Sequence, residues 1–103
     1  MTTPLPPFLR TFATRDPAFV ERIAKIREDV CYTAGALPVK TKLLIAMALD
    51  LYSASELGTA TFAARAREAG ATEAEIIEVV ELCYSVAGLQ QMANAVHAFP
   101  PEA

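Results

Sequence analysis

Asp50 is the one charged residue within an apolar segment, LLIAMALDL, at residues 43–51. A carboxyl group buried in an apolar helix has a raised pKa and can act as a general acid or base. The alternative is that Asp50 lies near the end of its helix, where it touches solvent or caps a neighbouring helix. Perturbed carboxylates mark functional sites in only some proteins, so both interpretations stay open at this point.

Two further polar residues stand where a helix is predicted to begin. Ser55 can cap this helix, and Glu56 falls in its first turn, where a negative charge is favoured by the helix dipole. The free N–H groups at such an end attract anions, so a small carboxylate ligand could bind at Ser55. Ordinary capping is the simpler alternative.

His97 is the only imidazole in the chain. It could serve as a general base if the last helix folds over its own pocket or over a neighbour's pocket. Beside Val96 and Phe99 it could equally be a partly buried or surface histidine. The hydroxyl group of Tyr84 could line a cavity, although aromatic residues at helix ends are commonly packing anchors.

The two cysteines, Cys31 and Cys83, are far apart and lack the spacing of metal ligands. Together with His97 they cannot complete a zinc site, so we expect neither a metal nor another cofactor. Cys83 falls on an apolar stripe with Ile76 and Val80, where a free cysteine commonly behaves as a small buried hydrophobic residue. A reactive thiol at Cys83 is the alternative.

The composition bounds the class of protein. The 103 residues fit one domain, and 53% of them are hydrophobic whereas 20% are charged. So short a chain cannot bury that much apolar surface within itself, which predicts an obligate homo-oligomer. A net charge of −3 without a basic cluster argues against a nucleic-acid partner. With no apolar run of ~18 residues and no signal-peptide pattern at the N-terminus, we expect a cytoplasmic protein that does not associate with membranes.

The elements that must position these residues are all helical. No segment alternates with the period of a strand, which predicts an all-α fold of about five helices. Residues 1–15 contain three prolines and are expected to form an extended N-terminal arm. The folded domain is expected at residues 16–99, and residues 100–103 form a tail.

The first two helices have clear start signals. The first is predicted to begin at Asp16 and Pro17 and to end at Gly35. The second begins near Pro38 and is apolar on nearly every side, which predicts a central, buried position. In the first helix, apolar residues recur every three or four positions and predict one buried stripe. This stripe consists of Phe19, Ile23, Ile26 and Val30.

Two junctions define the remaining helices. The third helix is predicted to run from the cap at Ser55 to a stop at Gly70. Thr72 and Glu75 have the residue types and spacing of a capping box, which starts the fourth helix. Gly88 is predicted to interrupt that helix, leaving a fifth segment that ends before the C-terminal prolines.

Three segments follow one another in the order AGALPVKTKLLIAMAL, FAARAREAGATEAEIIEVV and YSVAGLQQMANAVHAF. Taken in this order, they resemble the carboxymuconolactone decarboxylase family. The entry to the family's core helix is similar to AGALPVKTKLLIAMAL, and an alanine-rich helix with a Gly-Ala-Thr turn is similar to FAARAREAGATEAEIIEVV. The family's last helix is similar to YSVAGLQQMANAVHAF. The resemblance covers residues 16–99 and implies the family's all-α fold and its assembly as homotrimers or homohexamers.

The redox branch of this family, the alkylhydroperoxidase-D-like proteins, starts the third helix with Cys-x-x-Cys-x-x-x-His and places a glutamate on the core helix twelve residues earlier. By the resemblance these positions fall at Ser55, Gly58, Phe62 and Leu43. Disulfide chemistry needs a thiolate, a second thiol and a proton relay, and none of these stands here. The resemblance therefore does not carry the peroxidase activity over, and the lost histidine weakens the transfer of the decarboxylase activity as well. Asp50, seven residues after the Leu43 position, would lie on the same helix face.

Three functions follow as hypotheses. The first is a non-redox enzyme, of lyase or isomerase type, or a binder for a small organic acid or lactone. The second is a structural or ligand-binding module that has lost catalysis, and the third is a residual thiol peroxidase that depends on Cys83. For the first hypothesis the candidate catalytic residues are Asp50, Glu56 and His97. Its candidate ligand-binding residues are Ser55, Phe62, Leu43 and Tyr84.

Overall fold

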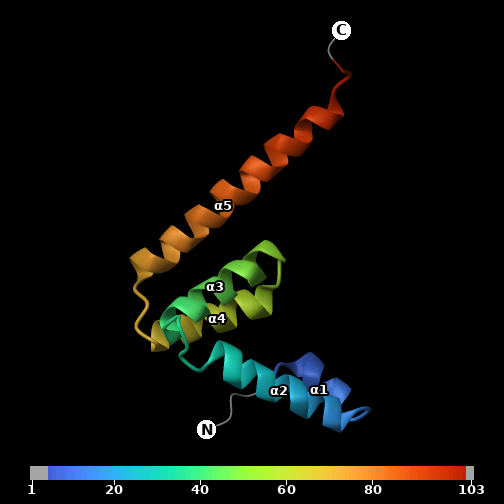
Figure 1. The fold of residues 1–103 in the computed structure, drawn as a ribbon, viewed down its shortest axis with the longest axis vertical. Helices are drawn as coiled ribbons and strands as arrows, with labels where there is room; N and C mark the ends of the chain where they lie inside the picture. Colours follow the sequence, from blue (N-terminus) through green and yellow to red (C-terminus); the bar gives the residue numbers. More distant parts are fainter. Residues whose placement is uncertain (1–4, 102–103) are drawn as a thin grey trace.

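A computed structural model describes residues 5–101 of the chain. This part of the chain forms five α-helices and no strand, which confirms the all-α prediction (Figure 1). The helices are α1 (Pro7–Ala13), α2 (Pro17–Cys31), α3 (Val39–Tyr52), α4 (Glu56–Glu68) and α5 (Glu73–Ala95), and a short 3-10 turn follows at Val96–Ala98.

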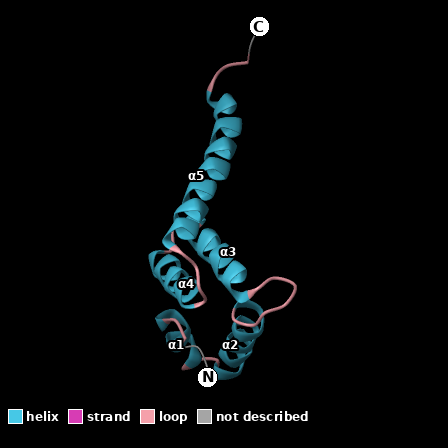
Figure 2. Ribbon diagram, turned by 90° about the vertical axis from the view of Figure 1, so that its left-hand side faces the viewer, coloured by secondary structure: helices cyan, strands magenta, loops and turns pink. Residues whose placement is uncertain are grey.

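The protomer is elongated. The pair α1–α2 lies at one end, α3 and α4 pack along each other in the middle, and α5 projects away from them (Figures 1 and 2). The longest dimension is 61 Å and the radius of gyration is 17.6 Å. A compact domain of this length has a radius of gyration of about 13 Å. The single chain is therefore far from globular.

A small core lies between α3, α4 and the start of α5. Leu43 and Met47 of α3 are only 2% and 1% exposed, and they pack with Ala66 of α4 and Ile76 of α5. The second predicted helix, α3, is therefore buried on one side, whereas a buried position on nearly every side was expected. Its other side carries Leu49, which is 64% exposed in the protomer.

The predicted stripe on the first helix is largely exposed. Ile26 and Val30 are 62% and 57% exposed, whereas Tyr32, at the C-terminal end of α2, packs against the core. The helix also ends earlier than predicted, at Cys31 rather than at Gly35. Lys42 explains this early end, since its ammonium group donates hydrogen bonds to the carbonyls of Val30 and Thr33, at 2.9 and 2.8 Å.

The N-terminal arm is not extended over its whole length. Residues Pro7–Ala13 form α1, preceded by Pro6 at the N-cap. Proline is well tolerated in the first helical turn because its missing N–H has no intrahelical partner there, so Pro7 starts the helix instead of preventing it. Residues 1–4 of the predicted arm lie outside the described residues.

The predicted interruption at Gly88 is wrong. The helix α5 runs without a break from Glu73 to Ala95. A glycine inside a helix costs about 1 kcal/mol relative to alanine, which weakens a helix without ending it. The helix ends instead ahead of Pro100, which disfavours helical geometry in the residue before it.

The junctions around α4 form as predicted. The side chain of Ser55 accepts a hydrogen bond from the N–H of Gly58 at 3.1 Å, and Gly70 takes a φ of +101° after the end of α4. Thr72 and Glu75 form the complete capping box at the start of α5. These local signals fix the ends of α4 and α5 independently of the rest of the fold.

Glu75 does more than cap α5. Its carboxylate accepts a hydrogen bond from the N–H of Thr72 at 2.8 Å and from the ammonium group of Lys40 on α3 at 3.0 Å. The Thr72 N–H, and after it Lys40, lower the pKa of Glu75 below its ordinary value. This one side chain therefore joins the start of α5 to α3.

The lowered pKa of Glu75 predicts a dependence of stability on pH. The stabilisation is present above the ordinary pKa of a glutamate and is lost as the pH falls through the lower pKa of the folded state. Between about pH 5 and pH 3 the melting temperature of the wild type should therefore fall more steeply than that of Glu75→Gln. Glu78→Gln, on the same helix, is the matched control and should follow the wild type. Parallel curves for Glu75→Gln and the wild type would contradict the assignment.

Candidate functional site

The first turn of α4 brings together several of the predicted residues. The N–H of Ser55 donates to the carbonyl of Asp50 at 2.9 Å, so the end of α3 and the start of α4 form one tight corner. Glu56 opens α4 and is exposed to solvent. Asp50 and Ser55 are half-buried. Asp50 thus lies beside the start of α4, at the edge of the core rather than deep within it.

Gly58 makes this corner possible. A Cβ atom at position 58 would overlap the carboxylate of Asp50 and approach the hydroxyl oxygen of Ser55 to 2.9 Å. The carboxylate therefore rests directly on the backbone of α4, in space that only a glycine leaves open. The requirement for glycine at this helical position comes from Asp50 and not from the backbone conformation.

A cavity of about 240 Å³ opens beside Phe62, one turn further along α4. We call it the Phe62 pocket. Its walls come from α4, α2 and the N-terminal segment that leads into α1. The lining residues are Leu5, Pro6, Pro7, Phe8, Arg27, Leu57, Thr61, Phe62 and Arg65. The ring of Phe62 stacks on that of Tyr32, with centroids 6.3 Å apart and an interplanar angle of 26°.

Two arginines of the Phe62 pocket were not predicted as site residues. Arg27 lies 5.5 Å above the ring of Tyr32 and donates a hydrogen bond to its hydroxyl at 3.3 Å. Arg65 pairs with Glu68 at 3.2 Å, and this hydrogen bond is the main reason why the pKa of Arg65 is raised. Arg65 could have been found from sequence, since it stands three residues after Phe62 on the same helix face. Arg27 comes from another helix and has no such signal.

The other predicted ligand-binding residues lie elsewhere. Leu43 is part of the core and does not line the Phe62 pocket. Tyr84 is 81% exposed, and with Cys83 it lines an open depression where α3 and α5 cross. The described part of the chain therefore joins Asp50, Ser55 and Glu56 at one corner and keeps Phe62 near them on α4, while Tyr84 belongs to a different surface.

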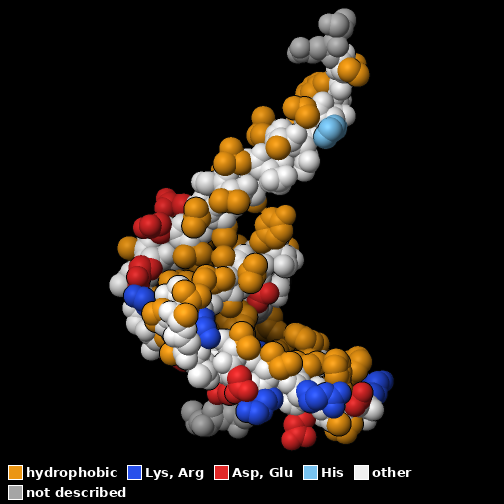
Figure 3. Space-filling view, viewed as in Figure 1, with side chains coloured by type: hydrophobic (Ala, Val, Ile, Leu, Met, Phe, Trp, Pro, Cys, Tyr) orange, Lys and Arg blue, Asp and Glu red, His pale blue; other side chains and the backbone are white. Residues whose placement is uncertain are grey.

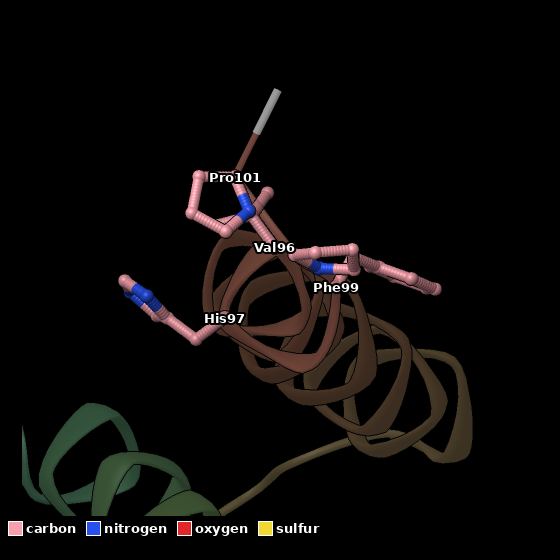
Figure 4. A pocket seen from close by; sticks show the side chains of 5 residues that line it. Val96, His97, Phe99 and Pro101 are labelled. Atoms are coloured by element: carbon pink, nitrogen blue, oxygen red, sulfur yellow. The ribbon is translucent and has the colours of Figure 1, made fainter. Parts of the chain in front are cut away.

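His97 lies near the end of the projecting helix. It stands with Val96, Phe99 and Pro101 around a hollow that is open to solvent (Figure 4). The side chains of His97 and Phe99 point to different sides of the chain and do not converge on an enclosed space (Figure 4). Within one protomer, the described residues bring no acid, base or nucleophile beside this imidazole.

Both cysteines are free thiols. Cys83 is partly buried, and its sulfur lies 3.9 Å from the carbonyl oxygen of Ala48 on α3. Residues 5–101 contain no group of three histidine, cysteine or acidic side chains arranged to hold a metal ion. No helix in this part of the chain is both long and apolar enough to cross a bilayer.

Comparison with known families decides the assignment. The profile of the carboxymuconolactone decarboxylase family matches residues 17–99, most of the chain. The chain belongs to the carboxymuconolactone decarboxylase family. No curated protein and no solved structure matches it. The family assignment and the all-α fold predicted from sequence are both confirmed.

In this member of the carboxymuconolactone decarboxylase family, three positions correspond to the two cysteines and the histidine of the redox motif. They lie at the N-cap and in the first two turns of α4. They hold Ser55, Gly58 and Phe62. One is a helix cap, one leaves space for a carboxylate, and one forms a wall of the pocket. Each position therefore has a physical role here that is not redox chemistry.

The contact between Gly58 and Asp50 can be tested by mutation. Glycine to alanine inside a helix commonly stabilises by up to about 1 kcal/mol. We expect Gly58→Ala to destabilise instead, by about 1–3 kcal/mol in urea unfolding at fixed protomer concentration, because the new methyl group meets the Asp50 carboxylate. In the background of Asp50→Ala the same change should cost little.

Gly35→Ala is the matched control for this double-mutant cycle. Its Cβ would meet only the flexible side chain of Lys42, at 3.5 Å, so its free energy of unfolding should stay within about 0.5 kcal/mol of the wild type. Equal costs of Gly58→Ala with and without Asp50 would show that the two residues are not in contact.

Proposed function

We propose that this protein is a non-redox member of its family that binds a small organic acid or lactone in the Phe62 pocket. One observation carries the proposal: the family's motif positions hold no thiol and no imidazole, and the same helix instead forms a wall of a small cavity. Aromatic and aliphatic side chains line most of this cavity, together with a few polar groups, which is typical of small-molecule sites.

Binding is the activity that the geometry supports best, since none of the described residues that line the Phe62 pocket carries a carboxylate or an imidazole. A lyase or isomerase reaction would need an acid or base, and Asp50, on α3 beside the start of α4, is the first candidate for that role. Glu56 is the second candidate. His97 could take part only from another protomer, because its own helix carries it away from α4 (Figure 3).

The binding proposal is tested by filling the pocket. Thr61→Trp places an indole in a cavity of about 240 Å³ and should abolish binding of both benzoate and the aromatic lactone phthalide, measured by ligand-observed NMR or calorimetry. Ala64→Trp, at an exposed position of the same helix, is the control and should bind as the wild type does. If neither compound binds the wild type, the alternative of a structural module without a ligand is favoured.

We also propose that the protein works as a homotrimer or homohexamer. The accessible surface of the protomer is 7688 Å², whereas a folded monomer of this mass exposes about 5,700 Å². Many large apolar side chains are exposed in the protomer, and the sequence from Cys83 to Pro101 contains no acidic residue, lysine or arginine. Apolar side chains accumulate along α5 (Figure 3).

The apolar flank of α5 supports burial against other subunits. We define it by side chains that are each at least 60% exposed: Leu82, Val86, Leu89, Met92 and Val96. They follow one another at steps of three or four residues along the projecting part of α5 and into the 3-10 turn that contains Val96. A soluble monomer rarely leaves such a continuous apolar strip uncovered.

A charge placed on this flank should break the assembly. Leu89→Asp is expected to convert the oligomer into monomers in native mass spectrometry, since each buried leucine contributes about 1.5–3 kcal/mol and an unpaired carboxylate adds a desolvation cost. Asn94→Asp adds the same charge at a polar position of the same helix and should leave the subunit count unchanged. A wild type that is monomeric at micromolar concentration would refute the proposed assembly.

A further inference from the structure

We infer that Arg27 and Arg65 form a carboxylate-binding subsite in the Phe62 pocket, so that its ligand is a one-ring aromatic acid rather than a lactone. This inference rests on the proposed function, which names the same pocket but leaves acid and lactone open. It is carried by the placement of the two guanidinium groups, by the charge of the lining and by the shape of the cavity.

Two arginines from different helices line the pocket. Arg27 of α2 donates to the hydroxyl of Tyr32 at 3.3 Å. Arg65 of α4 lines the same cavity, and its guanidinium group pairs with Glu68 at 3.2 Å. A guanidinium pair in this position can bind both oxygens of a carboxylate.

The charge of the pocket favours an anion. Among the described residues, its lining includes two arginines and no acidic side chain. Glu68, which pairs with Arg65, is not part of the lining, and its side chain is 65% exposed to solvent. An exposed ion pair of this kind contributes little, so Arg65 can exchange it for a ligand at small cost.

A third arginine shows the contrast. Arg67, on the same helix as Arg65, donates two parallel hydrogen bonds to the carboxylate of Glu73, both at 3.0 Å. This fork is complete and links the end of α4 to the start of α5, which is a structural role. Arg65 uses a single terminal nitrogen on Glu68 and lines a cavity with the rest of its side chain.

The shape of the cavity indicates a flat, compact ligand. At about 240 Å³ it is smaller than the 300–1,000 Å³ of ordinary drug-sized sites. Phe62, stacked on Tyr32, gives it an aromatic wall, and Leu57 and Phe8 add apolar surface. A single ring fits against this wall with its carboxylate directed to the arginines, while the hydroxyl of Thr61 offers a further donor.

The experiment compares two ligands of the same shape, benzoate and its neutral analogue benzamide, with the full-length protein in its native assembly. Benzoate should bind at least about tenfold more tightly than benzamide, as expected for one charge-assisted contact. Arg27→Gln and Arg65→Gln should each weaken benzoate by about tenfold or more and leave benzamide unchanged. Raising the salt concentration should weaken benzoate alone.

Arg22→Gln is the matched control, because Arg22 lies on α2 over the ring of Phe19 and does not line the pocket. It should bind benzoate as the wild type does. Thermal unfolding of each variant checks that the protein is folded, and native mass spectrometry checks its subunit count.

Each remaining outcome separates the two proposals. Equal binding of benzoate and benzamide, or benzoate binding that survives both arginine substitutions, would overturn the carboxylate subsite and leave the pocket itself standing. Failure of benzoate, benzamide and phthalide alike would overturn both. If benzoate does not bind and Arg65→Gln instead dissociates the assembly, the two arginines form ion pairs with a carboxylate of another subunit. The inference is then wrong.

Discussion

The packing of α3 against α4 is the contact on which the rest of the protomer depends. Leu43 and Met47 on one helix and Ala66 on the other exclude water almost completely, and they are among the few side chains of the chain that are fully buried. The other elements attach to this pair at its ends: α5 through Glu75 and Lys40, and α2 through Lys42. A protomer with so small a core is marginal by itself, since stability grows with the fraction of surface that folding buries.

This arrangement separates two kinds of surface on one short chain. The corner between α3 and α4 is built from polar contacts within the protomer and holds the Phe62 pocket beside it. The projecting part of α5 is apolar and has little contact with its own chain. Substitutions in the first region should act on the site, and those in the second on assembly. The two sets can therefore be studied independently, as long as the subunit count is measured for each variant.

Sequence reasoning was most successful where a feature depends on neighbouring residues. The caps at Ser55 and Thr72 and the turn at Gly70 are local, and they were predicted correctly. Gly88 was misread because a preference of about 1 kcal/mol was treated as decisive. Arg27 was missed because it lines the cavity from α2 whereas Phe62 lies on α4, and this proximity exists only after folding. The stripe on α2 was expected to be buried, but it is largely exposed. The spacing of apolar residues shows which side of a helix is apolar, and it does not show which other surface packs against that side.

The close approach of Gly58 and Asp50 also limits how this chain could change over evolutionary time. By the family resemblance, position 58 corresponds to the second cysteine of the redox motif, and a cysteine there would carry a Cβ atom into the Asp50 carboxylate. A cysteine at position 58 would therefore require the Asp50 side chain to move or to be replaced by a smaller one. Position 50 thus limits which residues position 58 can accept, although it would take no part in thiol chemistry itself.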